Sequence, residues 1–417
     1  MDYLPLLIEE TKYYLYAQRR GEVRLNPASP LLNVDRLHQV INDYKGRDVD
    51  FSERKILKAV GYFMLELILE NQPQVQHLKS ELDQKLSTPL FRDRCGARLS
   101  VTELEQTLQA HAAEISTDEK NRAQQYISEE VAPLVDKRWR ETDRMCQSFM
   151  GASYVDCYDD FFDGTMTLKY RDKKEMCATV ADLFKEQRGA KADDPQVILA
   201  DVRKVAAKLT VKFDLNTIKL ENVSSPRASM YADPFSGEVT LRWPSGGGVT
   251  PVAKVWHECG HAIHYQNMRS DLPFAFKHLF DLRVLEAIAI LWEIIGCRYY
   301  GIPFLGQEKW WPTIQFLSTY EWLKSQGHAS YQKLFDDNLR LIFGHSFPKF
   351  PGAIRFLEPA FKCFRYVSAF DLAQIIDRRL VARYTDDWIF SSEAGKVLRT
   401  LMREGGAIDP MLPEIPA

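Results

Sequence analysis

The sequence predicts a mainly α-helical protein with one small β-sheet, and three observations lead to this fold class. Apolar residues recur at helical spacing between residues 52 and 70. Two capping-box patterns, Ser100 with Glu103 and Ser116 with Glu119, are typical of helix N-termini. Short β-like runs are confined to residues 211–243. The expected layout is a helical first half, a small sheet and a helical second half.

The elements between these signals follow in order along the chain. The helix after Ser116 should continue to about residue 150, and further helices are expected at 173–188 and 195–209. The turn PFSG predicts a hairpin between the last two strands. The strand candidates are VKFDL, TIKLENV, ASMYA and EVTLRW. The stretch PSGGG, residues 244–248, is a plain connector or a loop that touches a ligand.

Composition and charge limit the class of protein. Hydrophobic residues make up 45% and charged residues 27%, which is typical of a soluble globular protein. The net charge of −3 gives no reason to expect nucleic acid or an anionic membrane as a partner. The N-terminus lacks the basic start and long apolar core of a secretion signal. The seven cysteines form no CxxC pair, so we expect a protein of the reducing cytoplasm.

The stretch VAKVWHECGHAIHYQN, residues 252–267, contains the pattern with the clearest chemistry. His257 and His261 are four residues apart, so on a helix they share one face and can offer two imidazole nitrogens to one zinc ion. Glu258 lies beside them and can act as a general base on water without binding the metal. The alternative is an ordinary buried helix whose histidines are satisfied by hydrogen bonds.

A catalytic zinc needs a third protein ligand. The pattern HExxHxxGxxH is broken, because His264 and Asn267 occupy the positions of its glycine and last histidine. A glutamate from a later helix is another source. The segment VLEAIAILWEIIG is apolar on nearly every face, which indicates a buried helix, yet it contains Glu286 and Glu293.

A buried carboxylate is costly unless it is paired or binds a metal. We therefore predict that Glu286 is the third ligand. Glu293 would hold a ligand histidine through its other ring nitrogen. The alternative for both is a buried pair with an arginine, such as Arg283 or Arg298.

Three nearby residues each have two interpretations. Asp281 is a candidate supporting group near the metal or a solvated loop acid. His264 lines the substrate cleft or is a core histidine satisfied by hydrogen bonds. Cys259 is expected to be a small buried residue and not a ligand.

VAKVWHECGHAIH resembles the HExGHxxH block of the thimet oligopeptidase and oligopeptidase F family of zinc metallopeptidases, with Gly260 and His264 at positions of the extended motif. The interval from His261 to Glu286, and the position of Glu293, are also similar to those of that family. The angiotensin-converting enzyme family is similar more distantly. The specific match covers residues 252–293.

The resemblance implies a helical, zincin-like (gluzincin) peptidase fold, with the small sheet next to the zinc helix and a deep channel for short peptides. One zinc ion would bind His257, His261 and Glu286, with Glu258 as the base. An edge strand at 238–243 would pair with an extended substrate. Arg242 on that strand would meet a substrate carboxylate or be solvated.

The family also carries a tyrosine-rich C-terminal stretch, often with a histidine, that donates hydrogen bonds to the oxyanion. The counterparts here are Tyr366, within residues 361–374, and His345. The alternatives are a core aromatic for Tyr366 and a loop histidine for His345. The chain departs from the family in having Ala287 and Ile288 where Pro and Ser usually follow the glutamate, and in being shorter.

We therefore predict a cytoplasmic zinc metallopeptidase that hydrolyses short peptides, without nucleic-acid or membrane partners. Residues 1–210 would form a helical half and residues 211–417 the catalytic half of one integrated fold. The alternatives are a dedicated zinc amide hydrolase for one modified peptide or small amide, a zinc-bound peptide-binding protein with little catalysis, and a helical protein with a chance motif.

Overall fold

The computed structural model describes most of the chain, in some short stretches the backbone alone. The described residues are 3–19, 28–46, 49–104, 107, 114–162, 164–180, 191–192, 195–223, 229–233, 236–244, 250–279, 282–302, 304, 307–325, 330–343 and 362–405. Four sites of the sequence predictions lie outside these residues or partly so: Asp281, His345, the connector after Pro244, and the first half of the PFSG turn.

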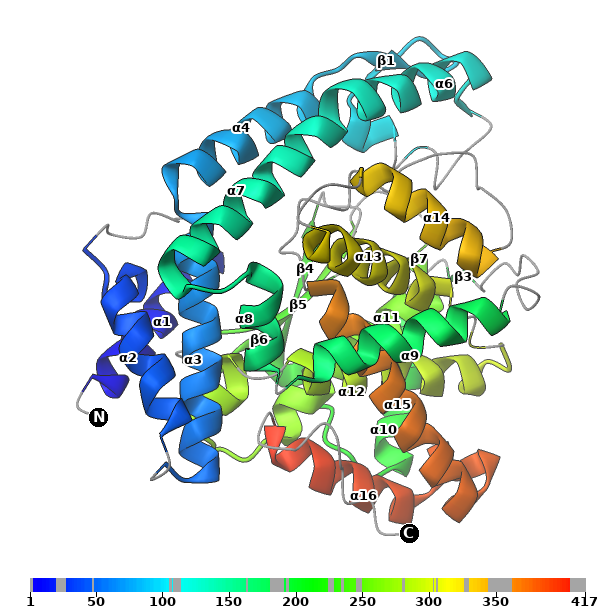
Figure 1. Cartoon of the computed structure of the whole chain (residues 1–417). Coiled ribbons are helices and arrows are strands. Elements are labelled where there is room, and N and C mark those ends of the chain that lie inside the picture. Colours follow the sequence, from blue (N-terminus) through cyan, green and yellow to red (C-terminus); the bar gives the residue numbers. More distant parts are fainter. Residues whose placement is uncertain are drawn as a thin grey trace. The chain divides into compact units, whose positions relative to one another are not determined.

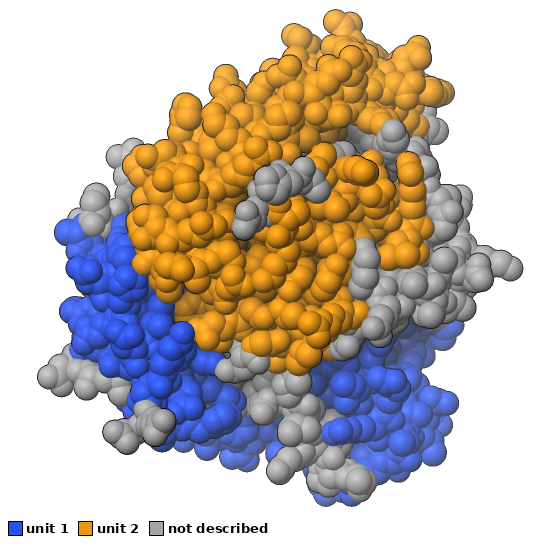
Figure 2. Space-filling view, viewed as in Figure 1, with its two compact units in different colours: residues 1–63, 186–309, 365–417 blue, residues 64–185, 310–364 orange. Residues whose placement is uncertain are grey.

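The chain divides into two compact units, drawn in different colours in Figure 2. The first comprises Met1–Phe63, Glu186–Lys309 and Arg365–Ala417, and the second comprises Met64–Lys185 and Trp310–Phe364. Both units therefore draw on both of the sequence halves, 1–210 and 211–417. The integration of these halves into one fold stays a prediction.

The first unit holds the helix with His257 and His261, and the small sheet (Figure 1). The first unit shares two helices with the second unit, because α3 ends there and α15 begins there. Its elements are α1 (Leu4–Arg19), the 3-10 helix η1 (Pro30–Leu32), α2 (Val34–Lys45), α3 (Phe51–Glu70), β3 (Lys191–Ala192), α10 (Pro195–Lys208), η4 (Leu215–Thr217), β4 (Ile218–Val223), β5 (Ser229–Ala232), β6 (Val239–Pro244), β7 (Thr250–Pro251), α11 (Val252–Asn267), the π-helical turn η5 (Ala275–Leu279), α12 (Leu282–Tyr299), α15 (Lys362–Tyr384), η7 (Asp386–Phe390) and α16 (Ser392–Arg403).

In the residues that the structure describes, the second unit is helical apart from one two-stranded ribbon. The second unit shares helix α13 with the first unit, because the first three residues of this helix belong to the first unit. Its elements are α4 (Pro73–Ser87), β1 (Phe91–Arg92), β2 (Arg98–Leu99), α6 (Thr117–Tyr126), the π-helical turn η3 (Ile127–Val131), α7 (Ala132–Met150), α8 (Tyr154–Phe161), α9 (Thr165–Val180), α13 (Gln307–Lys324) and α14 (Tyr331–Phe343).

Both predicted capping serines begin helices, and the capping box is complete at Ser100 but not at Ser116, where the Glu119 carboxylate accepts from Arg92 and Arg122. Ser100 Oγ accepts from the Glu103 backbone N–H, and the Glu103 carboxylate accepts from the Ser100 N–H, at 3.2 and 2.8 Å. Ser116 Oγ caps the Glu119 N–H at 3.2 Å. The helix that follows runs to residue 150 as predicted, interrupted only by the π-helical turn. These starts are set by local side chains, which is why the sequence reveals them.

The small sheet has the strand order β4-β6-β5. Strand β6 pairs in parallel with β4 and antiparallel with β5, which confirms the predicted hairpin between the last two strands. The prediction that residues 238–243 form an edge strand is wrong, because β6 is the central strand and both sides of its backbone are already paired. A central strand cannot add a further strand.

The predicted strand VKFDL is also wrong. Residues 211–214 are irregular, and two side-chain amides at the end of α11 satisfy their backbone groups. Asn267 bonds both the N–H and the C=O of Lys212, at 3.1 and 2.8 Å. Gln266 does the same for Asp214, at 2.9 and 3.0 Å. These amides replace the partner strand that the alternating pattern suggested.

Helix α11 lies in the core of the first unit, packed against α10, α12, α16, β5 and β6 (Figure 1). Its contacts with α12 run in opposite chain directions: Trp256 lies against Gly296, and Gly260 against Ala289 and Trp292. The two helices are therefore antiparallel. Among the described helices, none is long and apolar enough to cross a membrane.

Candidate metal centre

Helix α11 places His257 and His261 on one face, as the four-residue spacing predicts. Their ring centroids are 4.9 Å apart and the ring planes are nearly perpendicular, at 87°. His257 is buried, and 15% of the His261 side chain is exposed. One face of a buried helix therefore offers two imidazoles, one of which is accessible from outside.

Helix α12 brings Glu286 to the same point. Its Oε2 lies 3.4 Å from His257 Nε2 and 3.6 Å from His261 Nε2. One donor atom from each residue lies within 4.8 Å of the other two. Glu286 Oε2 is buried without a hydrogen-bond partner, so a divalent cation between the three side chains would satisfy it. The residue types and their arrangement fit a zinc ion.

Charge around Glu286 favours its ionised form. Burial alone would raise the pKa of this carboxyl, but the neighbouring His261 and His257 outweigh burial and lower it. The carboxylate is therefore available as a metal ligand at neutral pH.

Glu293 is seven residues, or about two turns, beyond Glu286 on α12 and lies on the other side of His257. Its Oε2 is 3.4 Å from His257 Nδ1. Burial would lower the pKa of His257, but the carboxylates of Glu286 and Glu293 reverse this and raise it to about 10. Each nitrogen of this ring therefore faces a carboxylate, but Nδ1 makes no well-formed hydrogen bond with the described residues. In metal sites of this kind one ring nitrogen binds the metal and a supporting group holds the other.

The arginine alternative for these glutamates loses one of its candidates. Arg298, at the end of α12, pairs with Asp377 and Asp386, each at 2.8 Å. Its charge is thus used in a separate cluster, in which Trp388 Nε1 also donates to Asp377 at 3.1 Å.

Glu258 and His264 are both buried on α11. Glu258 follows His257 directly and is not one of the three converging donors. Burial, and then the charge of His261, lower the pKa of His264 to about 3, so its ring is neutral. Met402 lies close through its backbone, yet neither ring nitrogen makes a well-formed hydrogen bond. His264 is therefore buried, but it is not satisfied by well-formed hydrogen bonds, and its role stays a prediction. Cys259 is buried, as predicted.

The remaining residues named from the sequence are Tyr366, Asp281, His345 and Arg242. Tyr366 lies partly buried on α15, and its role stays a prediction. Asp281 and His345 fall outside the described residues. Arg242 is engaged within the sheet, bonding Glu221 at 3.0 Å and lying over the Tyr231 ring at 4.7 Å. It is therefore a paired strand arginine.

The packing that positions the triad depends on two glycines that the ligand pattern does not explain. Gly296 of α12 faces Trp256, whose ring would lie within 2.4 Å of an added Cβ. Gly260 of α11 faces Trp292 Cβ and the Ala289 backbone. In each of these two apolar helices a tryptophan is followed by a glycine four residues later. This shared spacing is the feature of the sequence that indicates the close packing.

Comparison with solved structures shows which class of protein has this fold. An M32 carboxypeptidase from Deinococcus radiodurans R1 matches with a TM-score of 0.57 at 11% identity, over 98% of this chain and 93% of that one. PZ peptidase A with an inhibitor matches with a TM-score of 0.58 at 12% identity, over 96% and 81%. A protein described as an oligoendopeptidase F, from Bacillus anthracis str. Ames, matches with 0.56 at 11%, over 98% and 78%.

The chain therefore has the helical, zincin-like fold of these metallopeptidases, as the sequence predicted. No protein-family model matches the sequence, and no curated protein matches it. At this level of identity the likeness defines the fold, and the chemistry has to be argued from the residues of the site.

Proposed function

We propose that this protein is a zinc-dependent metallopeptidase that hydrolyses peptide bonds in short peptides. The observation that carries the proposal is the convergence of Glu286 Oε2 with the Nε2 atoms of His257 and His261, at a buried point where that oxygen has no hydrogen-bond partner. Two imidazoles and one carboxylate form a ligand set of catalytic zinc. The likeness to metallopeptidase folds supports the same class.

Three residues would bind the zinc ion, and a fourth residue would orient one of the three. His257, His261 and Glu286 would hold the ion. When bound there, zinc supplies Lewis acidity, which makes water more acidic and polarises a carbonyl group. Glu293 would keep the proton on His257 Nδ1, and so leave Nε2 free for the ion.

Glu258 would transfer the proton during hydrolysis. It is held next to His257 by α11 and is not required as a ligand. Its carboxylate would accept a proton from the attacking water and deliver it to the leaving amine. Tyr366 and, as a second donor, His345 would stabilise the oxyanion by hydrogen bonds, a role that rests on the family resemblance.

Strand β5 replaces β6 as the strand that would hold an extended substrate. Among the described residues β5 pairs with β6 on one side only, and it packs against α11. The backbone of Ser229–Ala232 would therefore add the substrate as a further strand.

The test combines zinc analysis with cleavage of a quenched fluorescent library of short peptides. We expect about one zinc per chain and cleavage of many unrelated peptides. Glu258→Gln should keep the zinc and lower the cleavage rate by about 10²–10⁴-fold, the usual contribution of a general base. Glu129→Gln is the matched control, because Glu129 is exposed on the second unit and lies outside the site.

Each other outcome has a definite meaning. Zinc with cleavage of one narrow substrate would replace the oligopeptidase by a dedicated amide hydrolase. Zinc without cleavage would indicate a peptide-binding protein. Failure of the purified protein to take up zinc, even after reconstitution, would refute the proposal.

A further inference from the structure

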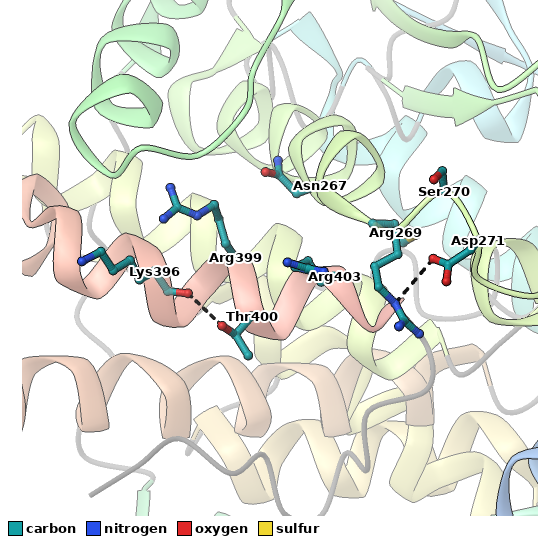
Figure 3. Close-up of a pocket in the computed structure, with 9 residues that line it drawn as sticks. Asn267, Arg269, Ser270, Asp271, Lys396, Arg399, Thr400 and Arg403 are labelled. Carbon is teal, nitrogen blue, oxygen red and sulfur yellow. Dashed lines mark hydrogen bonds and ion pairs between the residues drawn. The ribbon is translucent and has the colours of Figure 1, made fainter.

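A basic hollow lies between the end of α11 and helix α16, apart from the metal triad (Figure 3). Its volume is about 720 Å³, within the range of small-molecule sites. All of its lining belongs to the first unit. The residues that line it are Asn267, Met268, Arg269, Ser270, Asp271, Lys396, Arg399, Thr400 and Arg403.

The α16 side of the hollow is a single stripe of the helix. The positions 396, 399, 400 and 403 follow the spacing of three and four residues that places side chains on one helix face. Figure 3 shows Arg399 and Arg403 on the side of α16 nearer to Asn267. Three cations and one hydroxyl are thus aligned along one wall, and Arg269 adds a fourth cation from the end of α11.

Carboxylates neutralise only part of this charge. Lys396 pairs at 2.7 Å with Glu393, which is not one of the lining residues. Arg269 lies 3.7 Å from Asp271 and 3.4 Å from Glu404. The Asp271 side chain, the one carboxylate among the described lining residues, is 74% exposed, so its charge is strongly screened by water.

Arg399 and Arg403 have no carboxylate partner among the described residues. Arg399 donates to the backbone oxygen and hydroxyl of Thr210, which are neutral acceptors that fix the guanidinium without cancelling its charge. Like charges four residues apart on a helix repel each other. The dipole of α16 stabilises Arg403 in the last turn, but this effect falls off within one turn and does not account for Arg399 and Lys396.

The lining also indicates the class of anion. Arginine forks match the oxygens of phosphate and carboxylate groups, and Ser270 adds a neutral hydroxyl. Among the described residues that line the hollow none is aromatic, so none of them would stack on a nucleobase. Four cations spread over this volume exceed the needs of a single phosphate group.

We propose that this hollow binds a small phosphorylated molecule that carries two or more phosphate groups and no aromatic base. The proposal is independent of the peptidase function, because it uses none of the residues of the metal triad.

The test is calorimetric titration of the full chain with pyrophosphate, at low and at raised salt concentration. The wild type should bind, and raised salt should weaken binding because the contacts are ionic. Arg403→Gln should weaken binding about tenfold or more, the effect of losing a charge-assisted hydrogen bond. Arg203→Gln is the matched control: this exposed arginine of α10 lies outside the hollow, and its loss should leave affinity unchanged.

The same titration separates the alternatives. Pyrophosphate that bound at a zinc ion on the triad would bind equally well to Arg403→Gln, and that result would overturn the proposal. So would an absence of binding to the wild type, or an equal loss in Arg203→Gln. Citrate, which is a polycarboxylate of similar charge, should bind more weakly than pyrophosphate; equal affinity would refute the assignment to phosphate.

Discussion

Replacing Gly260 by alanine should separate α11 from α12 and weaken metal binding at the same time. An added Cβ would lie 2.8 Å from both Ala289 Cα and Trp292 Cβ, whereas ordinary contact begins at 3.4 Å. Ala289 and Trp292 are buried, and the closest atoms belong to backbone or to a side-chain root. They cannot rotate away, so the helices must move apart by about half an ångström.

This movement affects stability and metal binding differently. Overpacking of this kind costs about 1–3 kcal/mol, and the better helix propensity of alanine returns about 1 kcal/mol. The net loss of stability is about 1 kcal/mol, or about 1–2 °C in the unfolding midpoint of a chain of this size. Zinc tolerates errors of only about 0.2 Å in its ligand distances. Because Glu286 is on α12 and both histidines are on α11, zinc affinity should fall at least about tenfold.

Two measurements test this reasoning. Thermal unfolding in a chelator reports the stability of the metal-free protein, and competition with a chromophoric chelator reports zinc affinity. Gly46→Ala is the matched control, because φ is −61° at Gly46 and the closest atom to an added Cβ is Asp43 O at 3.1 Å. It should leave zinc affinity unchanged. Wild-type stability and zinc affinity in Gly260→Ala would refute the account of helix spacing.

Three further predictions concern other parts of the molecule. Glu293→Gln should weaken zinc binding about 10–100-fold by freeing His257 Nδ1, and an unchanged affinity in the chelator competition would contradict its orienting role. Burial raises the pKa of Asp136 to about 6, so the folded state holds this proton more tightly than the unfolded state, and the resulting stability is lost as pH rises from about 4 through 6. Asp136→Asn should therefore stabilise the protein at pH 8 by about 1 kcal/mol, a value that already allows for the partial exposure of Asp136. At pH 3 it should have no effect, and unfolding midpoints measured at the two pH values test both statements. Thiol labelling of the native protein should be fast at the exposed Cys95 and slow at the other cysteines whose side chains the structure describes, which are buried; rapid labelling of those before unfolding would show that the core opens readily.

The triad could be predicted from sequence because each part of its signal is local. The helical period places His257 and His261 on one face whatever surrounds them. Glu286 is conspicuous because it interrupts an otherwise apolar helix, where an unpaired carboxylate is costly. The joint arrangement needed one further assumption, that the two helices pack together, and the structure bears it out.

The sheet could not be predicted to the same depth, because strand order depends on contacts between distant residues. The pattern of EVTLRW identifies a strand and is silent about which neighbours it has, so β6 was placed at an edge although it is central. The segment at 211–214 has a strand-like pattern, but its hydrogen bonds go to Gln266 and Asn267, more than fifty positions away in the chain. Neither partner could be inferred from the segment itself.

The packing of α11 on α12 gives the glycine of the zinc motif a physical reason. The Trp256 ring lies against Gly296, and Trp292 Cβ lies with the Ala289 backbone against Gly260, so each helix comes close where the other has no side chain. The two indole rings are nearly parallel, with centroids 6.1 Å apart. A one-turn slip between the helices would move the Trp256 ring off Gly296 and Trp292 Cβ off Gly260, each onto a residue with a side chain. This reciprocal fit allows one register, and in that register Glu286 faces both histidines while Glu293 faces His257 from behind. The metal centre is thus specified by core packing as much as by the residues that would bind the ion.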